Sequence, residues 1–530
     1  SNYLILDIYL CSWKNLKGWL EDNAMASVNE DKELLRYAGD FRLELCNIIS
    51  YRTDPDNATE SLRINILPQL MNLSIVEDIS MECITGEIDL ADAQDIRTVL
   101  PLTGLERLEL KLYTPGSAKE DRVDTSEEQN DPFYIYKIEK IRPSGGTGRQ
   151  MVYRLHFTSR EAYRNSITKV SRAFEGPIEN AVAEILKDEK YLDSRKLCFI
   201  EESKSNSKFV IPNVRPFKAI EFLASQTISQ VYENANYLFF ETLRGYHFRS
   251  IESLLAIRGH TARPVVEKYH LQPANTRTQG NVDVEQAMRS VKHYSFDDPV
   301  NTLEDLSEGL FASRLVDTDL FYKKIETTNF DYHSTFGNFF HTEHSNGARS
   351  GIKFIQPHSV FDNTKKTLSE HPLQKLMNTT ATSKVHNNYD PVPNKDLIAN
   401  SISQRQQLMN NNLLLNVPGN TKVHAGDLIS FSLPSAKPIN PGESQELNPY
   451  YSGRYLVLQI KHKINRIDNK HEMVIRCSKD AVRNMLPVNT ETDLVKLKDK
   501  DNSQIISVFE DDERFLQNLS SDIDKSKTEV

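Results

Sequence analysis

The chain has 530 residues, which is too long for one hydrophobic core, so several domains are expected. Acidic residues outnumber basic ones, and the formal net charge of -10 argues against a protein whose main task is to grip phosphate backbones. The five cysteines include no C-x-x-C pair and are too widely spaced for a zinc ribbon, which favours free thiols in a reducing compartment. The longest apolar run near the start is far shorter than the roughly 20 residues of a membrane helix, so no membrane insertion is expected.

Residues 1–24 stand apart from the rest of the sequence. The chain begins with Ser1, and its first methionine is Met25, followed by the small residues Ala26 and Ser27 that are common after an initiator. We hypothesise that residues 1–24 are untranslated sequence read in frame, or otherwise a flexible extension. An authentic amphipathic helix is the alternative.

The first folded segment is predicted to be β-structure. Leu108, Leu110 and Leu112 alternate with charged residues, a period of two that places one face on a core and the other in water. This pattern predicts an antiparallel sheet or barrel that ends near residue 116. Residues 117–131 are acidic and almost devoid of apolar side chains, so they are expected to form an exposed loop.

Residues 132–232 mix strand and helix patterns, which predicts an α+β domain. Two apolar strands flank a glycine turn at residues 145–148. That turn lacks the Gly-Lys-Ser/Thr of a phosphate-binding loop and joins two strands, so a hairpin is expected there. Pro177 and Pro216 each suit the first turn of a helix.

Residues 236–255 return to strands, and the Leu-Arg-Gly sequence that ends at Gly245 predicts a hairpin turn. Residues 257–411 combine helical signals with a Ser/Asn-rich stretch, so they are expected to form a mixed domain with a polar linker.

Near the C-terminus the β pattern resumes. Leu456, Leu458 and Ile460 alternate with more polar neighbours, and residues 423–480 as a whole read as strands. Residues 483–530 are expected to be a polar, acidic tail.

One group of histidines is a candidate metal site. His333, His341 and His344 include a His-x-x-His pair that could chelate zinc from one turn. The glycine- and phenylalanine-containing surroundings look like an irregular loop, so neither a metal nor another cofactor is expected. The sequence contains no nucleophile elbow, H-E-x-x-H helix or Cys–His signature, so an enzyme is not expected.

From Val423 onwards the sequence resembles the last barrel of baseplate central hub proteins from contractile-tailed (T4-type) bacteriophages. The matching patterns there are VHAGDLISFSLPSA, YYSGRYLVLQIKHKINR and HEMVIRCSKD. Two upstream patterns, MVYRLHFTSREAYRN and NYLFFETLRGYHFRSIESL, resemble the same family. We expect a structural role for the residues that carry the resemblance, which are Gly245, Phe248, Gly426, Asp427, Gly453, Tyr455, His462 and Asp480.

The resemblance implies a multidomain, β-rich α+β fold with two tail-tube-like antiparallel β-barrels, plus α/β and inserted domains. The first barrel would be residues 25–116. The second would be discontinuous, with residues 233–256 paired to residues 412–482 and the mixed domain of residues 257–411 inserted between them.

The resemblance also implies a function, that of a structural virion component. A homotrimer would present six barrels as a pseudo-sixfold ring that joins the tail tube to the central spike and lets the genome pass. The implied partners are the chain itself, the central spike protein, the tail tube and tube-initiator proteins, the inner baseplate proteins and, transiently, DNA. The expected location is the tail baseplate of the virion, assembled in the cytoplasm of the host bacterium.

Three alternatives remain open. The chain could be a hub or spike subunit of a phage-derived injection or secretion machine, which shares the barrels. It could be a hub that carries cell-wall-degrading activity, although no such motif is visible. A β-rich carbohydrate-binding module is the third alternative, and it lacks an identifiable pattern of exposed aromatic residues.

Overall fold

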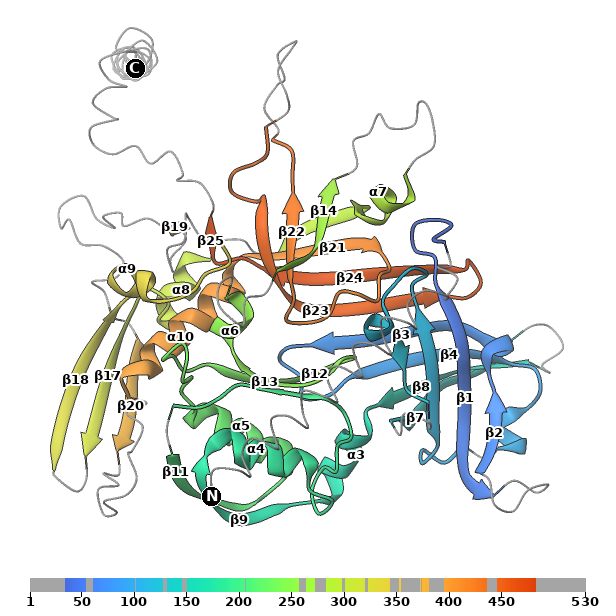
Figure 1. Ribbon diagram of the computed structural model, residues 1–530, viewed down its shortest axis with the longest axis horizontal. Helices are drawn as coiled ribbons and strands as arrows, with labels where there is room; N and C mark the ends of the chain where they lie inside the picture. The colour runs from blue at the N-terminus through green and yellow to red at the C-terminus, as the bar shows by residue number, and fades with distance from the viewer. Residues whose placement is uncertain are drawn as a thin grey trace, which may run out of the picture. The chain divides into compact units, whose positions relative to one another are not determined.

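The computed structural model describes most of the chain between residues 34 and 482 (Figure 1). The chain divides into two units, residues 1–483 and 484–530, and every described residue belongs to the first. The hypothesis about residues 1–24 and the expected tail at residues 483–530 therefore lie outside the described residues. The described residues are 34–53, 61–100, 102–126, 131–144, 150–204, 206–256, 264–271, 283–297, 301–319, 323–343, 352–353, 372, 374–380, 395–435 and 446–482.

Fifteen strands of the described chain form one large sheet with two halves. The first half is built from β1 (Arg42–Thr53), β2 (Ser61–Asn65), β3 (Leu70–Asp78), β4 (Thr85–Asp92), β5 (Arg107–Tyr113), β6 (Val123–Asp124), β7 (Phe133–Ser144) and β8 (Gln150–Thr158). The second half is built from β14 (Val265–Leu271), β15 (Ser290–Val291), β16 (His293–Asp297), β21 (Asn412–Pro418), β22 (Leu428–Ser432), β23 (Gly453–Asn465) and β24 (Lys470–Ser478). Neighbouring strands are antiparallel except where β14 pairs with β15 and β22.

The first half encloses its own apolar core. Leu108, Leu110 and Leu112 of β5 are all buried in it, which confirms the strand predicted from their alternation. β7 and β8 fall in the segment assigned to the α+β domain from the sequence, yet they pair with β5 and β4. The sheet therefore continues past residue 116.

The second half has a separate apolar core, and one detail of its pattern differs from the sequence-based expectation. Leu456, Leu458 and Ile460 were expected to share a face, but only Ile460 points into the core of this half. Leu456 and Leu458 pack on the other side, against Phe240. A bulge in the pairing of β23 with β24 at Val457 reverses the alternation, because one extra residue turns the following side chains to the opposite face.

The hairpin at residues 236–255 does not take the position expected for it. β12 (Tyr237–Thr242) and β13 (Gly245–Ser250) pair with each other and with β10 (Cys198–Ile200) in a separate sheet of three strands. Upstream strands that do pair with the C-terminal β-segment include β14 and β16. The predicted pairing is wrong because the hairpin contacts this half through apolar side chains, and the edge of its β13 is already occupied by β10.

The middle of the chain forms the mixed helix and strand region expected for it. Its elements are α3 (Arg160–Ile167), β9 (Val170–Pro177), α4 (Ile178–Lys187), β11 (Asn206–Val214) and α5 (Pro216–Gln226). Pro177 precedes the first residue of α4, and Pro216 opens α5, as predicted. The buried residues of α4 lie on one face, as expected for an amphipathic helix.

The region between the two parts of the second half contains a small sheet, whose strands lie in the order β18 (Lys324–Asp331), β17 (Ala312–Asp319) and β20 (Gln374–Thr380). α10 (Lys395–Asn410) contacts β17 and β18, and Figure 1 shows it beside them. The sequence of α10 was expected to be part of a polar linker. It is a helix because its polar residues find buried partners, such as Ser403, whose hydroxyl donates to the carbonyl of Leu310 at 2.8 Å.

The remaining elements are short. They are η1 (Leu67–Gln69), α2 (Ile96–Val99), η2 (Lys119–Asp121), α6 (Ile251–Leu255), α7 (Val284–Met288), α8 (Thr302–Glu308), α9 (Tyr332–Thr335), η4 (Phe336–Asn338), β19 (Ile352–Lys353) and β25 (Ala481–Val482). Among the described residues, no helix has the length and apolar character needed to cross a membrane.

Candidate functional site

The two halves of the large sheet join where β3 pairs with β23. We call this pairing the seam, and it consists of residues 72–78 of β3 and 459–465 of β23. The pairing is antiparallel and runs from Asn72 opposite Asn465 to Asp78 opposite Gln459. Because side chains alternate along each strand, the seam has one buried side and one side that faces solvent.

The buried side is organised by the carboxylate of Glu77. It accepts hydrogen bonds from His424 Nδ1 at 3.0 Å, from the Leu243 amide at 3.0 Å and from the Ala425 amide at 2.9 Å. Burial alone would raise the pKa of Glu77, but His424 and these hydrogen bonds outweigh burial and lower the pKa to about 2. One charged side chain thus ties the seam to the hairpin turn and to the loop before β22.

Two histidines, one of them in the seam, lie side by side in the interior. His462 Nδ1 and His471 Nε2 are 3.1 Å apart, and both side chains are buried. Burial lowers the pKa of His462 to about 4, and burial together with His462 holds the pKa of His471 well below its ordinary value. Gly419 packs directly on the imidazole ring of His471. A Cβ at this glycine would lie 2.0 Å from His471 Cγ. His462, a residue of the sequence signature, therefore belongs to a neutral, closely packed pair.

Gly426 and Asp427 form the turn that leads into β22. Gly426 has a φ of +82°, and a Cβ on it would lie 3.0 Å from the ring of Phe240 in the hairpin. The Asp427 carboxylate accepts from the His424 amide at 3.1 Å, and the Asp427 carbonyl accepts from the Val457 amide at 2.9 Å. This pair of signature residues thus holds the hairpin against the second half of the sheet.

Gly245 and Phe248 position the other face of the hairpin. Gly245 has a φ of +138°, and a Cβ on it would lie 2.3 Å from the carbonyl oxygen of Leu197. The next residue, Tyr246, donates its amide to that same carbonyl at 2.9 Å. The ring of Phe248 packs 4.9 Å from that of Tyr237 in the core of the middle region.

Asp480 closes the far end of β24 onto the segment around His341. Its carboxylate accepts from His341 Nδ1 at 2.8 Å and from the amide and hydroxyl of Thr342 at 2.9 and 2.8 Å. His341 Nε2 lies 2.9 Å from the carbonyl oxygen of Phe336. Burial would lower the pKa of His341, but Asp480 outweighs burial and raises it.

These contacts bear on the histidine metal candidate. Both ring nitrogens of His341 already have partners, and His333 stacks edge-on against Tyr332 instead. His344 lies outside the described residues. Within the part of the chain that the structure describes, no three metal-ligating side chains converge on one point.

Gly453 and Tyr455 lie at the start of β23. Gly453 has a φ of +135°, and a Cβ on it would lie 2.2 Å from Glu343 Oε1. The same oxygen accepts the amide of Arg454 at 2.6 Å. Tyr455 is buried in the core of the second half, and its hydroxyl donates to the Tyr451 carbonyl at 2.7 Å. The bend that the sequence predicted at Gly453 is therefore a point of close approach.

A cluster that sequence reasoning missed surrounds Lys196. Its ammonium lies 2.5 Å from Glu241, 3.0 Å from Glu161 and 3.4 Å from Asp131. Burial opposes its charge, but the three carboxylates outweigh burial and hold the pKa of Lys196 well above its ordinary value. The pKa of Asp131 rises to about 7 through burial. No motif marks this cluster, because its members come from four separate segments.

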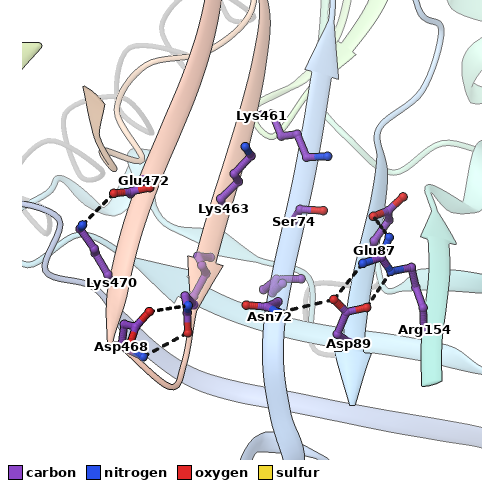
Figure 2. Close-up of a pocket in the computed structure, with 13 residues that line it drawn as sticks. Asn72, Ser74, Glu87, Asp89, Arg154, Lys461, Lys463, Asp468, Lys470 and Glu472 are labelled. Carbon is purple, nitrogen blue, oxygen red and sulfur yellow. Dashed lines mark hydrogen bonds and ion pairs between the residues drawn. The ribbon is translucent and has the colours of Figure 1, made fainter. Parts of the chain in front are cut away.

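The solvent side of the seam holds a groove of about 440 Å³ (Figure 2). Asn72 and Ser74 of β3 lie along its floor, and Lys461 and Lys463 of β23 lie beside them. On the β4 side, Arg154 pairs with Asp89 at 2.6 Å and with Glu87 at 3.1 Å. The groove thus presents both signs of charge to solvent and contains no paired nucleophile and base.

The chain is 21% identical over 400 residues to a probable baseplate hub protein, gp334, of Vibrio phage KVP40. The aligned residues cover 75% of this chain and 86% of that protein. No known family model matches the chain.

Solved structures of tail proteins are also similar. A tail protein of Neisseria meningitidis MC58 matches with a TM-score of 0.43 and 9% identity, over 84% of this chain and 97% of that chain. A 43 kDa tail protein of prophage MuSo2 from Shewanella oneidensis matches with a TM-score of 0.44 and 8% identity, over 82% of this chain and 98% of that chain. The match to the Vibrio phage protein, a probable baseplate hub protein, confirms the resemblance seen in the sequence.

Proposed function

We propose that this chain is a structural subunit of the baseplate hub of a contractile phage tail. The observation that carries the proposal is the match to the Vibrio phage hub protein, which extends over 400 residues. A match of that length is too long to come from a single half of the large sheet, so it favours a shared architecture of the whole hub.

Under this proposal, the two halves of the sheet are two tail-tube-like barrels. Each half has its own apolar core, and the two are joined edge to edge at the seam. Three copies would supply six such units. A homotrimer would therefore form a pseudo-sixfold ring between the tail tube and the central spike.

The same proposal names the partners. They are the central spike protein, the tail tube and tube-initiator proteins, and the inner baseplate proteins, with DNA passing through the ring. The net charge of -10 and the mixed charges of the groove favour passage without tight binding to phosphate. The chain would act in the tail baseplate of the virion after assembly in the host bacterial cytoplasm.

We also propose that the chain has no catalytic activity. The buried polar residues that could act as acids or bases, including Glu77, His341 and Asp480, are engaged in hydrogen bonds between segments. The alternative is a hub that degrades the cell wall. A zymogram of the purified protein tests this, since clearing of peptidoglycan would overturn the non-enzymatic assignment.

Mass measurement in solution followed by electron microscopy tests the hub itself. A ring with a mass near three times 60.7 kDa supports the proposal. A protein that stays a monomer at every concentration contradicts it. Detection of the chain in purified DNA-filled virions separates the phage hub from a subunit of a phage-derived injection or secretion machine.

A further inference from the structure

A groove that the proposed function does not use lies between β11 and α5 of the middle region (Figure 1). It consists of two hollows of about 540 and 460 Å³. Both hollows are lined by Val214, Lys218 and Glu221, so they are continuous. The two ends of this groove, which we call the β11–α5 groove, differ in chemistry.

One end of the β11–α5 groove is apolar. It is lined by Val210, Pro212 and Phe222. Val210 is 67% exposed and Phe222 is 45% exposed, whereas the neighbouring Ile211 and Leu223 are buried in the core of the middle region. Covering exposed apolar surface stabilises a complex, because water is released from that surface. This end therefore fits apolar side chains of a ligand.

The apolar end follows the edge of a strand. β11 lines it with three consecutive residues, 210–212. Because successive side chains of a strand point to opposite faces, a groove that touches all three must run along the edge of the strand. β9 pairs with one edge of β11, and no described strand pairs with the other edge. An open edge offers backbone amides and carbonyls to an extended chain, although Pro212 offers only its carbonyl.

The other end of the β11–α5 groove is positively charged. It is lined by Lys169, Arg215 and Lys218, together with Glu82 and Glu221. Lys218 pairs with Glu221 at 2.5 Å, and the carboxyl groups of Glu82 and Glu221 share a hydrogen bond. Burial and Glu221 raise the pKa of Glu82, which favours its neutral form. No described carboxylate pairs with Lys169 or Arg215, so two positive charges remain for a ligand.

We infer that the β11–α5 groove binds a short extended segment of another protein, one that carries large apolar side chains at one end and acidic residues at the other. The apolar side chains would lie against Val210 and Phe222, and the backbone would pair with the open edge of β11. The carboxylates would meet Lys169 and Arg215. A strand rises about 3.3 Å per residue, so the stretch from residue 210 to 214 spans roughly 13 Å, and a segment of about four or five residues covers it.

The two ends together favour a peptide over a nucleic acid. Phosphates would satisfy Lys169 and Arg215, but they would leave the exposed apolar side chains in the same groove uncovered. The inference goes beyond the hub proposal, because the groove lies within one copy of the chain and its chemistry does not depend on a ring.

Selection of a displayed random-peptide library on the immobilised full chain tests this inference. The enriched peptides should combine apolar and acidic residues. A fluorescently labelled peptide of the enriched sequence then gives a dissociation constant by fluorescence polarisation. Lys169→Glu should weaken binding about tenfold or more, because a charge-assisted hydrogen bond is replaced by repulsion. Phe222→Ser should also weaken binding severalfold, because it removes apolar contact area.

Two control variants make the same changes outside the groove. Lys190→Glu reverses the charge of an exposed lysine, and Val231→Ser replaces a valine that is 57% exposed. Both should bind the peptide as the unsubstituted chain does. Because all four substituted side chains are exposed, each variant should keep its fold, and thermal unfolding checks this.

The outcomes decide between a peptide, a nucleic acid and no ligand. Weaker peptide binding to Lys169→Glu and Phe222→Ser, but not to the controls, supports the inference. Absence of any enriched peptide, or equal binding to all four variants and the unsubstituted chain, overturns it. A labelled oligodeoxythymidine whose binding is weakened by Lys169→Glu but not by Phe222→Ser, and which displaces the peptide, would identify a phosphate chain as the ligand and overturn the peptide assignment. A chain that is a monomer by mass, yet binds the peptide in the expected way, contradicts the hub proposal and leaves the inference intact.

Discussion

The buried side of the seam and the groove on its solvent side use their polar residues differently. On the buried side, Glu77 accepts three hydrogen bonds from two other segments, and His462 pairs with His471. On the solvent side, the Arg154 and Asp89 side chains pair while 25% and 21% exposed. Exposed ion pairs stabilise a fold by about 0–1 kcal/mol, whereas breaking a buried one costs about 3–5 kcal/mol. Stability is therefore concentrated on one side, and the other side is left to meet solvent or a passing ligand.

Removing the buried carboxylate should have the largest effect. Glu77→Ala leaves the His424 side chain and two backbone amides without an acceptor, so the free energy of unfolding should fall by about 3–5 kcal/mol. Chemical denaturation measures this change. The matched control is Glu87→Ala on the solvent side of the seam, which should lower stability by less than about 1 kcal/mol. Equal losses in the two variants would contradict the proposed division between the sides.

The buried histidines should make the protein sensitive to acid. The pKa of His462 is lowered from 6.5 to about 4. Below about pH 6.5, His462 therefore binds a proton in the unfolded chain but not in the folded chain. Stability should therefore be full above pH 6.5 and fall towards pH 4, by up to roughly 3 kcal/mol for this residue. His471 should steepen this loss. Glu77 should add a further loss as the pH falls from its ordinary 4.5 towards about 2.

Denaturation midpoints measured at steps of pH test this expectation. The variant His462→Gln should show a shallower loss of stability between pH 6.5 and 4, because only one of the two buried histidines remains. A profile identical to that of the unsubstituted protein would show that folding does not lower the pKa of His462.

Filling the space beside His471 should have a smaller effect. A methyl group at Gly419 would meet the imidazole ring at 2.0 Å, and overpacking of this kind costs typically 1–3 kcal/mol. Gly337→Ala is the control, because a Cβ there meets nothing within 4 Å. Thermal unfolding of Gly419→Ala and Gly337→Ala should separate the two. If both variants unfold at the same temperature, the packing around the histidine pair is looser than the structure indicates.

Truncating the groove lysines should have the smallest effect. Lys461→Ala and Lys463→Ala remove side chains that project into solvent beside the floor of the groove, so stability should change by less than about 0.5 kcal/mol. A larger loss in either variant would mean that the solvent side also carries part of the stability of the seam.

Much of the local structure could be predicted from the sequence. The alternation of Leu108, Leu110 and Leu112 predicted a strand and its buried face, and the amphipathic spacing after Pro177 predicted α4. Gly245 and Gly453 were placed at bends, and both have the positive φ that favours glycine. The relationship to hub proteins was also visible from the sequence, since short patterns of strand and turn residues survive at low identity.

The candidate site could be predicted only in part. His462, Asp427 and Asp480 were singled out, but their partners His471, His424 and His341 were not assigned to them. Glu77 was missed altogether, although its buried carboxylate accepts three hydrogen bonds. In the sequence, a buried carboxylate in an alternating strand looks like an ordinary surface residue. The alternation does not show whether another segment supplies hydrogen-bond donors to it.

The sequence by itself determined many of the strands and helices and the buried face of β5 and α4, because periods of 2 and 3.6 residues are local properties of the chain. Only the tertiary structure decided which strand edges meet. It paired the C-terminal strands with β14 and β16 rather than with the hairpin, and it joined the two halves through β3 and β23. The physical reason is that strand edges pair through backbone amides and carbonyls, which are the same for nearly every residue, so the choice of neighbour depends on how the cores pack.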